Sequence, residues 1–194
     1  MRGKAAGLAA LGAAMMAPAA AHAGVSEAYI GVFQHNACVL DCKNAFKEGE
    51  PNIEVEVNFD SPAFLHWAGS PKPMLMASVN TQGDTSYGGF GLDWRFHITD
   101  KVSFDPSFGY VVHNGENKDP YPNGTPEAFQ FSEEHVLLGS RDLFRTGLGL
   151  TYHFEGPWNV QGYYEHLSHG QILGHGRNQG LDEFGLRIGY EFGG

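Results

Sequence analysis

The fold is decided by two alternating runs near the end of the chain, WNVQGYYEHLS (residues 158–168) and LDEFGLRIGYEF (residues 181–192). Alternate residues of a β-strand share one face. In both runs one set of alternate residues is mainly apolar, namely Trp158, Val160, Gly162 and Tyr164 in the first and Phe184, Leu186, Ile188, Tyr190 and Phe192 in the second. The runs therefore predict two neighbouring strands, each with one apolar face.

Three polar residues interrupt this apolar face where the two runs meet the loop between them. His166 and Ser168 continue the alternation of the first run, and Asp182 continues that of the second. If the strands pair through the loop of residues 169–180, a histidine, a hydroxyl and a carboxylate converge. Such a set is recognised by its geometry and not by its order in the chain. The stretch therefore predicts a serine, histidine and acid site.

The first 23 residues have the features of a secretory leader. Arg2 and Lys4 precede an alanine-rich apolar run, and the run ends in Ala21-His22-Ala23, which fits the small-residue cleavage pattern. We therefore predict a signal peptide over residues 1–23. The remainder, residues 24–194, has a length typical of one exported domain.

The charge balance of the chain is strongly acidic. Its 12 basic residues, two of which lie in the predicted leader, face 22 acidic ones. A nucleic-acid partner is not expected, because such partners require basic surfaces.

Cys38 and Cys42 are the only cysteines of the chain. In an oxidising compartment two such residues can close a small loop through a disulfide, and the alternative is a pair of free thiols. A zinc site is not predicted, because no second cysteine pair exists to complete it.

Alternation of apolar and polar residues continues through most of the chain, as in residues 52–59 and 90–98. A soluble sandwich would bury the apolar face, whereas a membrane barrel would turn it to lipid and keep the charged face in its lumen. Four observations favour the barrel: the leader, the lack of a later apolar run of about 20 residues, the aromatic residues at the run ends, and the alternation of short with long links.

Eight alternating runs predict an all-β fold, an eight-stranded antiparallel transmembrane barrel. The runs cover residues 27–34, 52–59, 74–80, 87–98, 102–113, 144–154, 158–168 and 182–192. The charged face is expected to fill the lumen, because about eight strands leave room only for side chains. This lumen set comprises Glu54, Glu56, Asp93, Arg95, Arg145, His153, Glu165, Arg187 and Glu191.

The predicted topology sets the height of the polar trio in the membrane. From Trp158 to Ser168 a tilted strand rises roughly 25 Å, about the height of the apolar band of such barrels. The trio is therefore expected at the level of the outer leaflet, facing lipid. Polar groups there are costly unless they bond to one another, which makes them candidates for function. The alternative is that these strand ends stand clear of the membrane in water.

The terminal segment resembles that of the outer-membrane lipid A 3-O-deacylases. The matching residues are His166-Leu167-Ser168 and Asn178-Gln179-Gly180-Leu181-Asp182, and weaker likeness extends to residues 78–94 and 138–150. The resemblance implies an eight-stranded barrel that hydrolyses the ester-linked 3-position acyl chain of lipopolysaccharide, with its serine on the outer wall. It also implies that Asn178 and Gly180 shape the loop. The outer membrane is then the expected location, with lipid A as partner and a homodimer left open.

The expected chemistry is that of a serine esterase without metal or cofactor. His166 would take the proton of Ser168, and Asp182 would orient the imidazolium. Where the family often has an asparagine after the serine, this chain has His169. Its ring N–H, or the backbone N–H groups of Gly170 and Gln171, are the candidates for holding the oxyanion.

Two alternatives belong to other classes of protein. A non-catalytic barrel with a structural or adhesive role would use its outer loops, residues 37–49 and 115–134, and would leave the polar trio unexplained. A metal site formed by His166, His169 and His175 would need a ligand spacing that fits no sharp template.

Overall fold

The computed structural model describes residues 24–39 and 47–193. The predicted signal peptide and Cys42 lie outside this range, so both stay predictions. Cys38 does not carry a free thiol.

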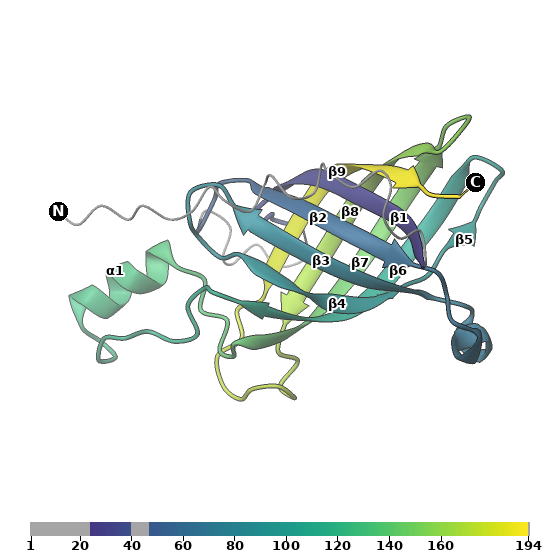
Figure 1. Cartoon of the computed structure of the whole chain (residues 1–194). Coiled ribbons are helices and arrows are strands. Elements are labelled where there is room, and N and C mark those ends of the chain that lie inside the picture. Colours follow the sequence, from purple (N-terminus) through teal and green to yellow (C-terminus); the bar gives the residue numbers. More distant parts are fainter. Residues whose placement is uncertain (1–23, 40–46, 194) are drawn as a thin grey trace.

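The described chain forms a closed antiparallel barrel of eight strands (Figure 1). Consecutive strands pair with each other, except that β4 and β5 both pair with β6, and β1 closes the barrel by pairing with β9 from Glu27↔Glu191 to Gln34↔Phe184. The strands are β1 (Val25–Gln34), β2 (Asn52–Phe59), β3 (Lys72–Asn80), β4 (Tyr87–Asp93), β5 (Phe96–His97), β6 (Val102–His113), β7 (Asp142–His153), β8 (Trp158–Ser168) and β9 (Leu181–Glu191). The predicted fold class is therefore confirmed.

The fourth predicted strand is divided into β4 and β5, and the division has a local cause. Both parts pair with β6 in one unbroken register, with Asp93 opposite Ser107 and Phe96 opposite Phe104. Between them Trp94 donates its backbone N–H to the carbonyl of Pro106 at 2.9 Å. Proline has no N–H to return the bond. The ladder is interrupted there, but the wall of the barrel is not.

Inside the barrel, charged side chains pair with one another as the alternation predicts. Arg145 and Arg187 are fully buried between Glu54 and Glu56, and Arg145 also pairs with Glu165. Pairing of this kind is what makes buried charges tolerable. The lumen is therefore filled by side chains and forms no open channel at this level.

The outer surface of the barrel wall is apolar. Ile30, Leu75, Phe90, Leu150 and Leu186 are each more than half exposed. An apolar outer face and a charged interior are the arrangement of a barrel that sits in lipid.

Among the described residues, two helices lie in the links, at opposite ends of the barrel. A short 3-10 helix, η2 (Ala63–Ala68), joins β2 to β3, and α1 (Pro126–Glu134) lies between β6 and β7. Figure 1 shows α1 protruding beyond the end that also carries the β8–β9 loop. Within the described residues no helix is long and apolar enough to span a membrane. α1 falls in a segment predicted only as an outer loop.

Candidate active site

The pairing of β8 with β9 places the polar trio together on the outer wall. His166 lies directly opposite Asp182 in the ladder. Its Nδ1 is 2.6 Å from Asp182 Oδ1. The side chains of the neighbouring residues Leu167 and Leu181 point the other way and are buried. His166 and Asp182 therefore both face outward, as the alternation predicts. Glu183, the neighbour of Asp182, is instead buried on the lumen side.

The contact with Asp182 determines which nitrogen of His166 carries a proton. Because a carboxylate accepts hydrogen bonds, Nδ1 must be the donor, which leaves Nε2 as the basic nitrogen. Asp182 also accepts a hydrogen bond of 2.9 Å from the hydroxyl of Tyr164, two residues before His166 on the same face. The Asp182 side chain is only 4% exposed, whereas that of His166 is 37% exposed. The carboxylate of Asp182 is thus covered, and the ring of His166 is accessible.

Ser168 and His166 line one small cavity of about 130 Å³ together with Asp182. Within the described part of the chain, the Ser168 hydroxyl makes no hydrogen bond, so no direct bond to His166 Nε2 is formed. Catalytic hydrogen bonds are often long before substrate binds and tighten in the complex. The two side chains therefore share a cavity without a hydrogen bond between them.

An apolar cluster inside the barrel anchors these strand ends from behind. The cluster consists of Met76, Tyr87, Val111, Val136, Leu138, Leu143, Leu167 and Leu181. Because Leu167 lies between His166 and Ser168 in the sequence, its burial fixes the direction of both outward side chains. The packing of the interior thus positions the site on the exterior.

In the β8–β9 loop, His169 and Gln171 do not lie where an oxyanion role requires them. Both ring nitrogens of His169 are engaged, Nε2 with the carbonyl of Arg177 at 3.1 Å and Nδ1 with the N–H of Gln171 at 3.1 Å. His169 is fully buried and does not line the cavity. The geometry therefore does not support the His169 ring or the Gln171 N–H as oxyanion donors. The Gly170 N–H has no acceptor among the described residues.

Two residues expected only to shape the loop lie in the cavity itself. Asn178 lines it beside Ser168, and its buried Oδ1 has no partner within the described residues. Gly180 has φ +67°, and a Cβ there would lie 3.0 Å from Cε1 of His166. Only glycine combines this left-handed backbone with such close contact to the ring. The sequence did not predict that Asn178 lines the cavity, although it lies in the Asn-x-Gly-x-Asp stretch that also contains Asp182.

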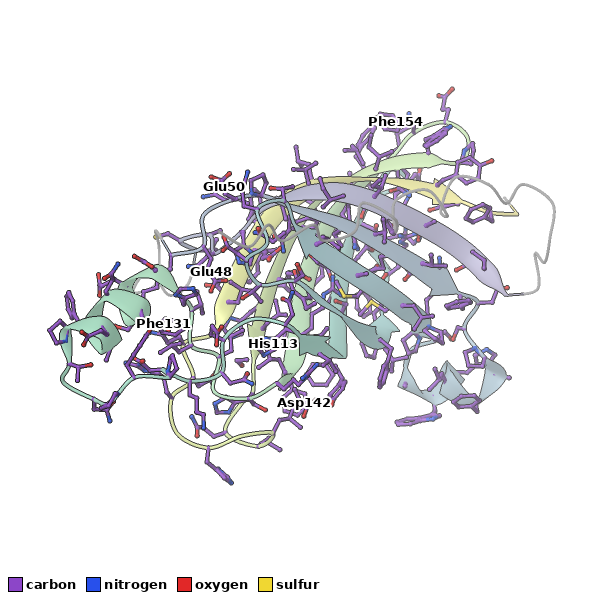
Figure 2. All side chains as sticks on the ribbon, turned by 60° about the vertical axis from the view of Figure 1, so that its left-hand side comes forward. Glu48, Glu50, His113, Phe131, Asp142 and Phe154 are labelled. Atoms are coloured by element: carbon purple, nitrogen blue, oxygen red, sulfur yellow. The ribbon has the colours of Figure 1, made fainter. Side chains whose placement is uncertain are left out.

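A buried group of side chains ties the outer loops to the start of β9. His35 lies between Glu183 Oε1 at 2.6 Å and Glu48 Oε2 at 3.3 Å. Glu48 also accepts the backbone N–H groups of Val136 at 2.8 Å and Thr85 at 3.2 Å. We call His35, Glu48 and Glu183 the loop clasp. In Figure 2, Glu48 and Phe154 mark opposite ends of the barrel.

The loop clasp carries a net electrostatic attraction. Burial by itself would lower the pKa of His35, but its hydrogen bonds to Glu183 and Glu48 prevail and raise the pKa to about 9. Burial would raise the pKa of Glu48, yet the bonds from His35, Thr85 and Val136 leave it below its ordinary value. The N–H of Ala37, close after His35, donates to the carbonyl of Asp182 at 2.7 Å. The clasp therefore holds the first loop against the acid of the site.

The histidines considered as metal ligands are not brought together. Among the residues that the structure describes, no three His, Cys, Asp or Glu side chains are arranged to hold a metal ion. His169 is turned away from His166 toward Arg177.

Comparisons with known proteins identify the family and support the fold. A family model described as lipid A 3-O-deacylase (PagL) matches residues 55–191. The crystal structure of the outer-membrane enzyme PagL is similar, with a TM-score of 0.54 and 13% identity over 87% of this chain and 99% of that one. The N-terminal β-barrel domain of Pseudomonas aeruginosa OprF has a TM-score of 0.50 and 13% identity, over 87% and 99% of the two chains. No curated protein matches the sequence.

Proposed function

Because the chain belongs to the lipid A 3-O-deacylase (PagL) family of ester hydrolases, we propose that it removes the 3-position acyl chain of lipid A with Ser168 as nucleophile. The proposal assigns three roles on the outer wall. Ser168 attacks the ester carbonyl, His166 is the base, and Asp182 holds the imidazole. The observation that carries it is the short contact from His166 to Asp182 beside a serine in the same cavity.

The acylation step follows from the proton positions in the site. A serine hydroxyl is a weak nucleophile at neutral pH, so Nε2 of His166 takes its proton as Oγ bonds to the carbonyl carbon. The carbonyl electrons move to oxygen. When the carbonyl re-forms, the bond to the sugar oxygen breaks, and the imidazolium returns its proton to that oxygen. Asp182 stabilises the imidazolium that exists between these events.

Two N–H groups are the candidates for holding the oxyanion. One is the side-chain NH₂ of Asn178, which lines the cavity, and the other is the backbone N–H of Gly170, two residues after Ser168, which has no acceptor among the described residues. Removing one such donor typically costs about 3 kcal/mol of transition-state stabilisation. We therefore assign the Asn178 amide and the Gly170 N–H to this role in place of the His169 ring.

The deacylation step reverses these roles with water as the nucleophile. His166 takes a proton from water, the hydroxide attacks the acyl-serine, and the fatty acid leaves as Ser168 recovers its proton. The exposed face of His166 gives water an entrance that the covered Asp182 lacks.

Fatty-acid release from purified lipopolysaccharide tests the proposal. We expect Ser168→Ala to lower release by at least about 10³-fold, as the loss of a catalytic serine does elsewhere. Ser132→Ala is the matched control, because the Ser132 hydroxyl bonds only to the Phe129 carbonyl on α1. Equal release by Ser168→Ala and Ser132→Ala would refute the serine mechanism.

A further inference from the structure

A pocket of about 520 Å³ lies at the outer end of the barrel, beside the protruding helix α1. Its lining combines the loop before α1, part of α1 itself and one residue of the β8–β9 loop, Arg177. We call it the α1 pocket. Its volume falls in the range of about 300 to 1,000 Å³ that ligand pockets span. It shares no lining residue with the small cavity that contains Ser168.

The side chains that the α1 pocket offers to a ligand are polar and carry both signs of charge. Asp119 accepts the N–H of Tyr121 at 2.9 Å through one oxygen, and its other oxygen is open to an additional donor. The guanidinium of Arg177 is a donor, and the amide of Asn123 is both donor and acceptor. Within the described part of the chain, the Asn123 and Arg177 side chains make no hydrogen bond. The pocket therefore presents donors and acceptors that are available to a ligand.

The rest of the lining is either occupied within the helix or apolar. Thr125 caps α1 by accepting the N–H of Ala128 at 3.2 Å, and the hydroxyl of Ser132 donates to the carbonyl of Phe129 at 3.0 Å. The ring of Phe129 is 69% exposed. An exposed phenyl ring beside polar groups gives a ligand one flat apolar surface to pack against.

This combination selects a neutral ligand that is rich in hydroxyl groups. The carboxylate of Asp119 repels an anion, and the guanidinium of Arg177 repels a cation. A wholly apolar molecule would leave the polar groups without partners. A sugar ring fits all of these conditions, because its hydroxyls both donate and accept while the C–H groups on one face pack against an aromatic ring.

Hydrogen bonds hold the α1 pocket next to the proposed catalytic residues. Nε2 of His169 donates to the carbonyl of Arg177 at 3.1 Å, and His169 directly follows Ser168. The segment after α1 is bound to the same loop, since the N–H of Leu137 donates to Gln179 Oε1 at 2.6 Å and its carbonyl accepts the Gln179 N–H at 3.3 Å. Gln179 lines the catalytic cavity. The pocket and the cavity are therefore joined through one loop.

The position of α1 suits the water-exposed part of a glycolipid. Figure 1 shows α1 beyond the end of the barrel that carries the β8–β9 loop, clear of the apolar wall. In lipopolysaccharide the oligosaccharide is attached to lipid A on the side away from its acyl chains. When the ester lies at Ser168, the oligosaccharide therefore extends past this end of the barrel, where the α1 pocket lies.

We propose, resting on the proposed function for the identity of the glycolipid, that the α1 pocket binds a sugar ring of the oligosaccharide attached to lipid A. The C–H face of the ring lies on Phe129, and its hydroxyls bond to Asp119 and Arg177. Intact lipopolysaccharide gains this contact, whereas lipid A without its oligosaccharide does not. The pocket thus favours the complete glycolipid as substrate.

Binding of the lipid-free oligosaccharide, released from lipopolysaccharide by mild acid, tests the pocket without any hydrolysis. Calorimetry on the protein in detergent gives the Kd. We expect Phe129→Ala and Arg177→Gln each to raise the Kd at least fivefold. Phe64→Ala is the matched control, because Phe64 is 72% exposed on η2 at the opposite end of the barrel. Its Kd should equal that of wild type.

A second readout is kcat/KM for lipopolysaccharide divided by kcat/KM for lipid A. We expect this ratio to fall at least fivefold in Phe129→Ala and to stay unchanged in Phe64→Ala, because lipid A alone cannot fill the α1 pocket. If Phe129→Ala fails to give the heat-modifiable folded band, Arg177→Gln makes the same test.

The outcomes separate this proposal from the proposed function. The proposal is overturned if wild type shows no saturable binding of the oligosaccharide, or if Phe129→Ala and Phe64→Ala have the same Kd. An unchanged ratio of kcat/KM values in Phe129→Ala likewise overturns it. Oligosaccharide binding by a wild type that hydrolyses neither substrate would instead refute the proposed function.

Discussion

The site depends on single side chains, and the alternation along each strand decides whether a side chain faces the lipid or the lumen. Asp182 and Glu183 are neighbours, yet Asp182 bonds to His166 outside the barrel while Glu183 bonds to His35 inside it. The two carboxylates therefore belong to different environments. Only the outer one can orient the imidazole.

Asp182→Asn tests this distinction. An amide in place of the carboxylate can leave the fold intact but favours the wrong tautomer of His166, so we expect kcat to fall by about 10³ to 10⁴-fold. Asp142→Asn is the control, because Asp142 also lies near the outer end and bonds to Tyr110. Its rate should stay within a few-fold of wild type. A similar loss in both variants would contradict the assigned role.

Tyr164→Phe tests the second contact of the acid. It removes the 2.9 Å hydrogen bond from the Tyr164 hydroxyl to Asp182 and keeps the ring. A hydrogen bond to a charged group contributes about 1.5 to 3 kcal/mol. We expect kcat to decrease roughly tenfold or more with KM little changed, since the ring itself is retained. A change in KM alone would show that Tyr164 acts on substrate binding.

At the scale of single residues, the sequence predicted that the trio lies together, and among the oxyanion candidates it named Gly170 but not Asn178. His166, Ser168 and Asp182 follow from alternation, which is a property of the strand alone. The direction of the His169 ring depends on the Arg177 carbonyl, which a loop brings to it. Loop geometry of this kind leaves no periodic signal in the sequence.

At the scale of elements, β8 and β9 are held from inside by the apolar cluster at the outer end of the lumen. Most strand bounds were predicted closely, and β2, β6 and β8 were predicted to the residue. The division of β4 from β5 follows from the missing N–H of Pro106, which alternation does not register. α1 was missed because its segment lies between strands and its helix is set by the Thr125 cap, which accepts the Ala128 N–H at 3.2 Å.

Leu167→Ala tests the anchoring of β8. Removing a fully buried leucine leaves a cavity, and we expect the free energy of unfolding to fall by about 2 to 5 kcal/mol. Leu150→Ala removes the same atoms from the lipid-facing side of β7, where Leu150 is 57% exposed. Urea unfolding in lipid vesicles should show a clearly smaller loss for this control. Equal losses would mean that the interior cluster does not hold the strand.

The loop clasp gives stability a dependence on pH. The pKa of His35 is raised from 6.5 to about 9, so its contribution is complete below about pH 6.5 and is lost as pH rises through about 9. We expect the unfolding temperature of wild type in detergent to fall over this window relative to His35→Gln. His175→Gln, in the exposed part of the β8–β9 loop, should follow wild type. Parallel pH profiles for wild type and His35→Gln would contradict the clasp.

At the scale of the whole molecule, the barrel is charged inside and apolar outside, and the proposed catalytic groups lie on its lipid-facing wall. The sequence predicted this arrangement, because each alternating run has one apolar and one charged face and the runs follow a predicted leader. The arrangement of the outer loops was not predictable, since Glu48 joins Thr85 and Val136 from links far apart in the sequence. The local sequence pattern was thus enough to predict the fold, but it did not predict how the outer loops pack beside the site.

The central claim is that the reactive hydroxyl of this barrel is Ser168 on the outer wall. Reaction of the membrane-embedded protein with a long-chain alkyl fluorophosphonate, followed by peptide mass mapping, tests it most directly. We predict one adduct, on Ser168, that forms with loss of hydrolysis and is absent in His166→Ala. Loss of hydrolysis with the adduct on another residue, or with Ser168 unmodified, would contradict the account.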